Sequence, residues 1–149
     1  MKTIFLFCGS FNPIHIGHLN IAQKAVSMFG KENVIICQGV NPSKESENRD
    51  SILYKKILQS FRTREYFCFT HEIIKDYVAD GLNVVLIKGL RNGDDLAYEN
   101  NQVSFIKDFY SNLNVIYIPC DKEFEYISSS AIRQLESFEP GSGEKYILK

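Results

Sequence analysis

The chain has 149 residues, of which 44% are hydrophobic and 23% charged, and its formal net charge is -1. This length predicts a single domain that buries roughly two thirds of the surface exposed by the unfolded chain. The charge balance excludes the strong basic excess typical of nucleic-acid-binding proteins, so any site for anions must be local.

The predicted elements alternate between strands and helices. In chain order they are a strand at 3–8, a helix at 19–29, a strand at 33–38, a helix at 52–61, a strand at 65–69, a helix at 73–78, a strand at 83–89, a helix at 103–110, a strand at 114–119 and a helix opened by the serines at 128–130. The strand segments are apolar on both faces, whereas the helical ones repeat apolar residues at helical spacing. This order predicts an α/β fold with a doubly wound, five-stranded parallel sheet and a ligand outside the carboxyl ends of its strands.

These elements fill one domain, residues 1–149, although the glycine-containing segment from about 138 to 149 predicts a loosely attached tail. No stretch approaches the roughly 18 consecutive apolar residues of a membrane-spanning helix, and the apolar run before Gly9 is too short for a signal peptide. We therefore expect a cytoplasmic protein with neither a membrane nor a nucleic-acid partner.

The loop GSFNPIHIGH, residues 9–18, joins the first strand to the first helix, where phosphate commonly docks on a helix N-terminus. Gly9 allows a ligand to approach the backbone, and Ser10 offers a hydroxyl. The histidines at 15 and 18 have a simpler interpretation as polar loop or capping residues. A zinc site is a weaker alternative, because no cysteine or acidic residue stands nearby.

Cations and hydroxyls follow three other predicted strands. Lys44 lies in the polar loop NPSK, where a solvated lysine is the ordinary alternative, and Lys88 and Arg91 directly follow the apolar run VVLI. The serines at 128–130 precede a helix, so they are equally typical of helix caps. Because the carboxyl ends of parallel strands meet at one edge, we expect these groups to converge there.

Together these motifs resemble a known family. The first loop is similar to the signature G-[ST]-F-[ND]-P-x-[HT]-x-G-H of the nucleotidyltransferase superfamily. With NPSK, KGLRNGDDLAYE at 88–99 and FEYISSSAIRQ at 124–134, the chain resembles phosphopantetheine adenylyltransferases over nearly its whole length. That family carries the pattern R-G-L-R-x-x-x-D-F-E-Y-E and an ISSS turn in the same order.

The resemblance implies a Rossmann-like fold and the transfer of an adenylyl group from ATP to 4′-phosphopantetheine, giving dephospho-coenzyme A and pyrophosphate. It also implies a homo-oligomer, a hexamer. The implied catalytic residues are His18, Lys44 and Arg91. The implied ATP-binding residues are Ser10, Phe11, His18, Gly89, Leu90, Arg91, Glu99, Phe124, Glu125, Tyr126, Ile127, Ser128, Ser129 and Ser130. The implied acceptor-binding residues are Ser10, Lys44, Ile74 and Lys88.

The chain departs from the family pattern at several positions. Ser10 replaces threonine, Asn12 replaces aspartate and Lys88 replaces the first arginine of RGLR, while His15 makes the loop more similar to mononucleotide adenylyltransferases. A lysine still binds phosphate but lacks the two-pronged geometry of arginine. Two alternatives therefore stay open: an adenylyltransferase for another phosphorylated acceptor, such as nicotinate or nicotinamide mononucleotide, and a non-catalytic nucleotide-binding relative.

The chemistry of such a transfer places its own demands on the site. A phosphate monoester is mostly dianionic at neutral pH, so its attack on the α-phosphorus of ATP needs no general base. It needs oriented positive charge and hydrogen-bond donors, which the cations and serines above supply. The sequence has no cluster of carboxylates for an all-protein Mg²⁺ cage, so we expect the metal on the triphosphate, keeping waters.

Overall fold

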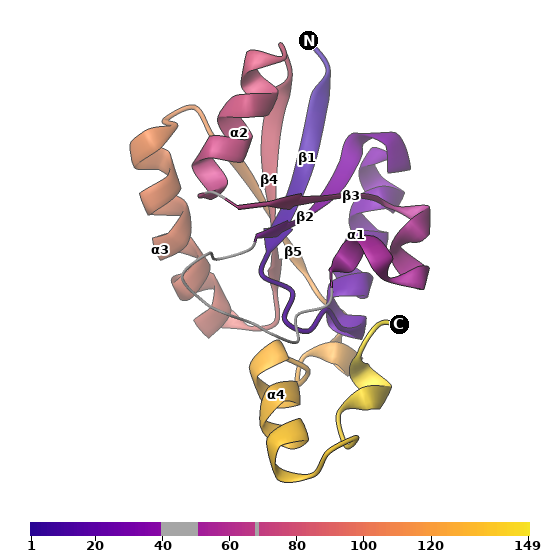
Figure 1. Cartoon of the computed structure of the whole chain (residues 1–149). Coiled ribbons are helices and arrows are strands. Elements are labelled where there is room, and N and C mark those ends of the chain that lie inside the picture. The colour runs from indigo at the N-terminus through magenta and orange to yellow at the C-terminus, as the bar shows by residue number, and fades with distance from the viewer. Residues whose placement is uncertain (40–50, 68) are drawn as a thin grey trace.

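The computed structural model describes residues 1–39, 51–67 and 69–149 of the chain; Lys44 and the rest of NPSK lie outside the described residues. Five parallel strands form one sheet in the order β3-β2-β1-β4-β5 (Figure 1). The strands are β1 Thr3–Gly9, β2 Val34–Gly39, β3 Arg62–Tyr66, β4 Asn83–Leu90 and β5 Asn114–Pro119, and the α-helices are α1 Ile16–Phe29, α2 Thr70–Ala79, α3 Gly93–Phe109 and α4 Ser129–Phe138. This confirms the predicted doubly wound α/β fold.

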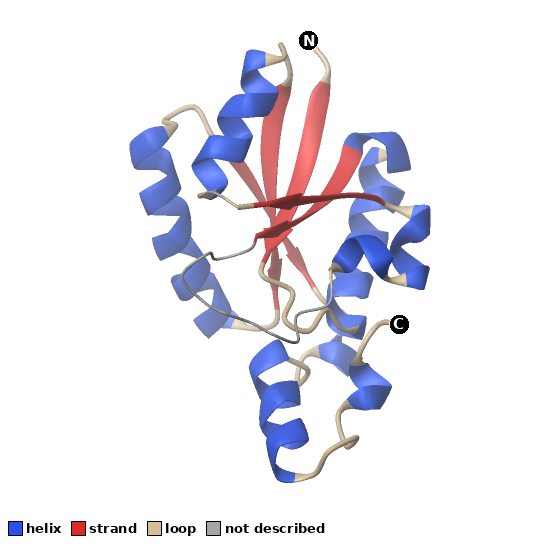
Figure 2. Cartoon of the chain, viewed as in Figure 1, coloured by secondary structure: helices blue, strands red, loops and turns tan. Residues whose placement is uncertain are grey.

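Helices cover both faces of the sheet (Figure 2). Alternate residues of β1 point to opposite faces: Phe7 joins the apolar cluster formed with α1, and Leu6 joins the cluster formed with α2 and α3. Both side chains are at most 5% exposed. Burial on both faces explains why β1, β2 and β4 are nearly continuous apolar runs. None of the helices in the described residues is long and apolar enough to cross a membrane.

The third strand lies earlier than predicted. β3 occupies Arg62–Tyr66 and pairs only with β2, at the edge of the sheet, where charged residues are well tolerated. Phe67 and Phe69, which suggested a buried strand at 65–69, are 66% and 74% exposed. The ring of Phe69 instead stacks on His71 of α2, at a centroid distance of 5.7 Å. The strand prediction was therefore wrong at Phe67 and Phe69.

The predicted helix at 52–61 is also wrong in type. The segment forms two 3₁₀ helices, Ile52–Tyr54 and Lys56–Ser60, separated by an extended Lys55. Ile52 and Leu58 are buried beside α1, and their spacing gave the segment its helical periodicity. Two short 3₁₀ helices bury Ile52 and Leu58 just as one continuous α-helix would. The spacing of apolar residues alone therefore does not distinguish the two structures.

The C-terminal segment is anchored at its end, unlike the loosely attached tail expected over 138–149. The N–H of Leu148 donates to the carbonyl of Ile14 (3.2 Å), and Ile147 forms an antiparallel bridge with His15. Leu148 is 2% exposed and belongs to the apolar cluster on the α1 face. The end of the chain therefore packs against the loop at 9–18.

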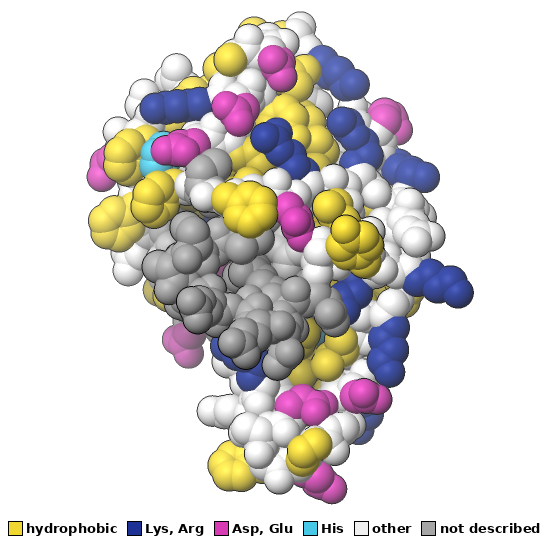
Figure 3. Space-filling model, viewed as in Figure 1, with side chains coloured by type: hydrophobic (Ala, Val, Ile, Leu, Met, Phe, Trp, Pro, Cys, Tyr) yellow, Lys and Arg dark blue, Asp and Glu magenta, His cyan; other side chains and the backbone are white. Residues whose placement is uncertain are grey.

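On the face of the molecule seen in Figure 3, Lys and Arg side chains are interspersed with Asp and Glu. The mixture agrees with the near-zero formal net charge of the sequence. The described part of this face therefore mixes both signs of charge, and an anion site must draw on local groups.

Candidate active site

A cavity of about 510 Å³ opens at the carboxyl ends of β1 and β4. These strands are neighbours in the sheet, but the chain leads from β1 to β2 on one side and from β4 to β5 on the other. That arrangement makes a topological switch point, where ligands of open α/β sheets bind. The cavity lining includes these residues implied by the family resemblance: Ser10, Phe11, His18, Lys88, Gly89, Leu90, Arg91, Glu99, Phe124, Ile127, Ser128, Ser129 and Ser130.

The loop at 9–18 forms one wall of the cavity and is held from several sides. Phe11 adopts a left-handed backbone conformation (φ 46°), and its ring is 5% exposed. The buried amide of Gln38, at the end of β2, donates to the carbonyl of Ser10 (3.2 Å) and accepts from the N–H of Ile52 (2.9 Å). These contacts and the hydrogen bond from Leu148 to Ile14 hold the irregular part of the loop, between β1 and α1, in place.

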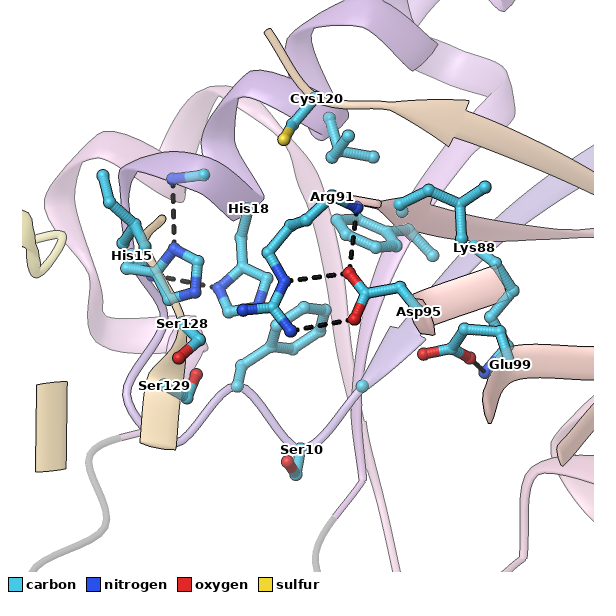
Figure 4. A pocket seen from close by; sticks show the side chains of 18 of the residues that line it. Ser10, His15, His18, Lys88, Arg91, Asp95, Glu99, Cys120, Ser128 and Ser129 are labelled. Atoms are coloured by element: carbon cyan, nitrogen blue, oxygen red, sulfur yellow. Dashed lines mark hydrogen bonds and ion pairs between the residues drawn. The ribbon is translucent and has the colours of Figure 1, made fainter. Parts of the chain in front are cut away.

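His15 and His18 fold against each other at the start of α1 (Figure 4). Their rings stack with centroids 3.7 Å apart. Nδ1 of His15 accepts from the N–H of Gly17, and Nδ1 of His18 accepts from the N–H of His15, each at 3.1 Å. In both neutral rings the proton therefore lies on Nε2, so each imidazole offers an N–H donor.

Gly17 allows this stacking. A Cβ atom at position 17 would lie 2.9 Å from Cε1 of His15, closer than real contacts permit. Because the imidazole ring is rigid, a side chain there would displace the whole ring of His15. The second glycine of the loop therefore serves the placement of the histidines.

Burial keeps both histidines neutral. Desolvation, with a further contribution from the positive charge of Arg91, lowers the pKa of His15 from 6.5 to about 4. Desolvation also lowers the pKa of His18 well below its usual value, and repulsion from His15, in its protonated form, and from Arg91 acts in the same direction. At neutral pH the two rings are consequently uncharged donors.

These pKa values predict a loss of stability in mild acid. The unfolded chain binds protons as the pH falls through 6.5, whereas folded His15 stays neutral to about pH 4. Between about pH 7 and 5 this difference lowers the free energy of unfolding by about 2 kcal/mol for His15, and His18 adds to it. Urea unfolding at both pH values measures the change. His15→Asn keeps a helix-capping side chain that cannot titrate, so its stability should fall less; equal losses would contradict the prediction.

Arg91 is clamped by Asp95 in the first turn of α3. Oδ2 of Asp95 accepts from the backbone N–H and from Nε of Arg91, and Oδ1 accepts from Nη2, each at 2.9 Å. Burial opposes ionisation of Asp95, but the hydrogen bonds and charge of Arg91 hold the pKa of its carboxyl below the ordinary value. The carboxyl of Asp95 is therefore ionised at neutral pH.

Lys88 and Glu99 form a second, more enclosed pair. Nζ of Lys88 lies 3.0 Å from Oε2 of Glu99, and the side chains are 15% and 23% exposed. Oε2 is buried and has no partner in hydrogen-bond alignment, so the contact is an ion pair without a well-directed hydrogen bond. The pair therefore places one carboxylate and one ammonium in the wall of the cavity.

The serine turn forms the wall opposite these pairs. Ser128 caps α4 by accepting from the N–H of Ala131 (3.1 Å), as the capping interpretation requires. Ser129 donates to the carbonyl of Pro13 (2.8 Å), which ties the turn to the loop at 9–18. The first turn of α4 thus faces the cavity with its free N–H groups and serine hydroxyls, an arrangement suited to phosphate.

Some implied site residues lie elsewhere. The side chain of Ile74 is fully buried in the apolar cluster on the α2 face and does not line the cavity. Glu125 is exposed, and Tyr126 packs edge-on against Tyr146, with ring centroids 6.1 Å apart. Lys44 lies outside the described residues.

The structure adds cavity residues that the sequence analysis did not assign. Among them are His15, Asp95, Tyr98, Gln102, Cys120 and Arg133. For His15 the spacing HxGH already carried the information, but a capping role was equally consistent with the sequence. Asp95 was indistinguishable from any acidic residue in the first turn of a helix.

The cavity also contains potential oxygen ligands for a metal. Within the described residues, however, no three His, Cys, Asp or Glu side chains are grouped to hold one. The two lining carboxylates already face Arg91 and Lys88. A divalent ion here fits best when a bound triphosphate supplies ligands to it.

The chain is similar over most of its length to characterised sequence families. The family model for cytidylyltransferase-like proteins matches residues 6–135. The phosphopantetheine adenylyltransferase of Mycoplasma mycoides subsp. mycoides is 32% identical over 140 residues, which cover 93% of this chain and 99% of that protein. The protein of the same name from Clostridium botulinum (strain Langeland) is 30% identical over 141 residues, covering 93% of this chain and 84% of its own length.

A solved structure is also similar. Plasmodium falciparum nicotinic acid mononucleotide adenylyltransferase, complexed with NaAD, matches 99% of this chain and 91% of its own with a TM-score of 0.61. The two sequences are 16% identical. This likeness shows a common fold.

Proposed function

The chain belongs to the cytidylyltransferase-like family and, within it, to the phosphopantetheine adenylyltransferases, and we propose that it transfers the adenylyl group of ATP to 4′-phosphopantetheine. The products are dephospho-coenzyme A and pyrophosphate. The observation that carries this proposal is the convergence of His18, Arg91 and the serine turn on one cavity, with Lys88 beside them.

The reaction needs no proton transfer from the protein. A phosphate oxygen of the acceptor forms a bond to the α-phosphorus of ATP, and the bond from that phosphorus to the bridging oxygen breaks as pyrophosphate leaves. Because the acceptor phosphate is mostly dianionic at pH 7, neutral histidines suffice. Their Nε2–H groups and the guanidinium stabilise negative charge on the crowded phosphoryl centre.

The cavity residues that the structure describes form two groups by position. His18, Arg91 and the first turn of α4 surround the place suited to the phosphates of ATP. Lys88 is placed to attract the acceptor phosphate, and the carboxylate of Glu99, which lines the same cavity, can accept a hydroxyl of the ATP ribose. A Mg²⁺ ion carried on the triphosphate would neutralise part of its charge, with phosphate oxygens and water as its main ligands.

A mononucleotide acceptor is the main alternative. His15 supports it, because this residue makes the first loop similar to that of the mononucleotide enzymes, and the Plasmodium falciparum structure shares the fold. Sequence identities of 30 to 32% with phosphopantetheine adenylyltransferases favour the acceptor proposed above. A non-catalytic nucleotide-binding protein would keep the cavity but show no turnover.

An acceptor panel tests the proposal. Pyrophosphate release from ATP is measured with 4′-phosphopantetheine, pantetheine, nicotinate mononucleotide and nicotinamide mononucleotide. We expect turnover with 4′-phosphopantetheine and none with pantetheine, which lacks the attacking phosphate. Higher kcat/KM for either mononucleotide would move the chain to the alternative, and ATP binding without any transfer would identify a non-catalytic relative.

Substitution of Lys88 tests the acceptor site. Lys88→Met should raise KM for 4′-phosphopantetheine by roughly 10- to 100-fold, the range of a lost hydrogen bond to a charged group, with a smaller effect on KM for ATP. Lys88→Arg is the matched control: it keeps the charge and should retain activity. Steady-state kinetics with each substrate varied in turn provides both constants. An unchanged acceptor KM in Lys88→Met would show that this ammonium does not bind the acceptor.

We also propose that the protein is cytoplasmic and assembles as a homo-oligomer, a hexamer, as the family resemblance implies. Several large apolar side chains of the described surface are exposed, including Phe67, Phe105 and Phe109, which is compatible with contacts between subunits. Light scattering coupled to gel filtration measures the assembled mass. A monomer at micromolar concentration would argue against the hexamer.

A further inference from the structure

Asp95 contacts Arg91 more extensively than a surface ion pair requires. Its two carboxylate oxygens accept three hydrogen bonds from the backbone N–H, Nε and Nη2 of this one residue. The position of Asp95 is itself fixed, because its backbone N–H donates to the side chain of Asn92, the N-cap of α3 (3.0 Å). The guanidinium is therefore held through Asp95 by the start of a helix.

The clamp leaves a defined part of the guanidinium free for a ligand. A guanidinium has five N–H bonds, and Asp95 engages the one on Nε and one on Nη2. Both N–H bonds of Nη1 and the second of Nη2 remain on the side away from the carboxylate. Figure 4 shows this side of Arg91 next to the ring of His18.

From this geometry we propose that Asp95 is a positioning residue, which orients Arg91 so that its free N–H groups and the histidine Nε2–H groups meet the same phosphates of ATP. The inference rests on the proposed function for its ligand. An arginine side chain otherwise samples many rotamers, which a ligand must restrict on binding. The contact with Asp95 restricts the rotamers of Arg91 before the ligand binds.

The contribution of orientation can be separated from that of charge. Asp95 is negative and lies beside the site for a triphosphate, so by charge alone its removal should tighten ATP binding. If Asp95 acts by orienting Arg91, its removal should weaken ATP binding instead. The two roles thus predict changes of opposite sign.

The experiment measures the Kd of ATP by isothermal titration calorimetry with the full chain. We expect Asp95→Asn to weaken binding by at least about fivefold, a typical coupling between directly contacting residues. Asp95→Ser, which removes both carboxylate oxygens, should do the same. Asp94→Asn is the matched control, since Asp94 carries the same charge in the same helical turn but is exposed, and it should not weaken binding.

A second comparison uses the background Arg91→Ala. There Asp95→Asn should cause no further weakening, because the residue that it orients is absent. Unchanged or tighter ATP binding in Asp95→Asn alone, or an equal loss in the Arg91→Ala background, would overturn the proposal. Because no acceptor is present, a failure to use 4′-phosphopantetheine would refute the proposed function without changing this result.

Discussion

Replacing His18 with alanine should lower kcat by roughly 100- to 1,000-fold, the usual cost of removing one donor from a developing negative charge. The affinity for ATP should change much less, because the donor acts mainly in the transition state. His18 lies in the cavity, its ring edge-on to Phe11 with centroids 4.9 Å apart, and its Nε2–H is the available donor. Single-turnover kinetics and calorimetric ATP binding separate the two effects.

A second variant tests whether the loss of activity in His18→Ala comes from the missing donor or only from local unfolding. His18→Asn can keep an acceptor near the position of Nδ1, which receives the N–H of His15, but it removes the Nε2–H donor. Its kcat should therefore fall about as far as that of His18→Ala. His71→Ala is the control, because this imidazole stacks on Phe109 outside the cavity (4.0 Å between centroids). Near-normal turnover in either His18 variant would refute the assigned role.

Arg91→Ala should lower kcat/KM by at least roughly 100-fold, because it removes a cationic donor of the phosphate site. It also leaves the carboxylate of Asp95, 20% exposed, without its partner and beside the triphosphate. Steady-state kinetics under ATP-limiting conditions measures the loss. We expect Asp95→Asn to recover part of it in the double variant, since the unpaired charge is then removed.

Arg91→Lys shows whether charge alone is sufficient. A lysine retains the positive charge but cannot make the paired contacts of Nε and Nη2 with one carboxylate. Its kcat/KM should lie between those of the wild type and Arg91→Ala. Wild-type activity in Arg91→Lys would show that the planar geometry of the guanidinium is unimportant here.

The sequence by itself determined the fold class and the place of the site. Strands β1, β2, β4 and β5 lie within one residue of their predicted ends, because burial on both faces leaves a continuous apolar run. The loop at 9–18, the cations at 88 and 91 and the serine turn each follow a strand. In a parallel sheet these positions share one edge, so their convergence on a cavity followed from chain order.

The third strand and the segment at 52–61 were decided by packing. Phe67 and Phe69 are as apolar as buried strand residues, yet β3 forms from RTREY because an edge strand needs only one partner and tolerates charge. Ile52 and Leu58 have helical spacing, but two short turns place both in the core. Local pattern cannot distinguish such cases, since burial depends on the partners that the fold supplies.

Only the tertiary structure decided how the groups of the candidate site are held. Gln38, 28 residues after Ser10, and Leu148, near the C-terminus, have no sequence feature that indicates a role in the first loop. They nevertheless donate hydrogen bonds to its carbonyls at Ser10 and Ile14. The clamp of Arg91 by Asp95 likewise depends on rotamers that chain order does not fix. Hydrogen bonds form between groups that are close in space, and the folding of the whole chain determines which distant residues become neighbours.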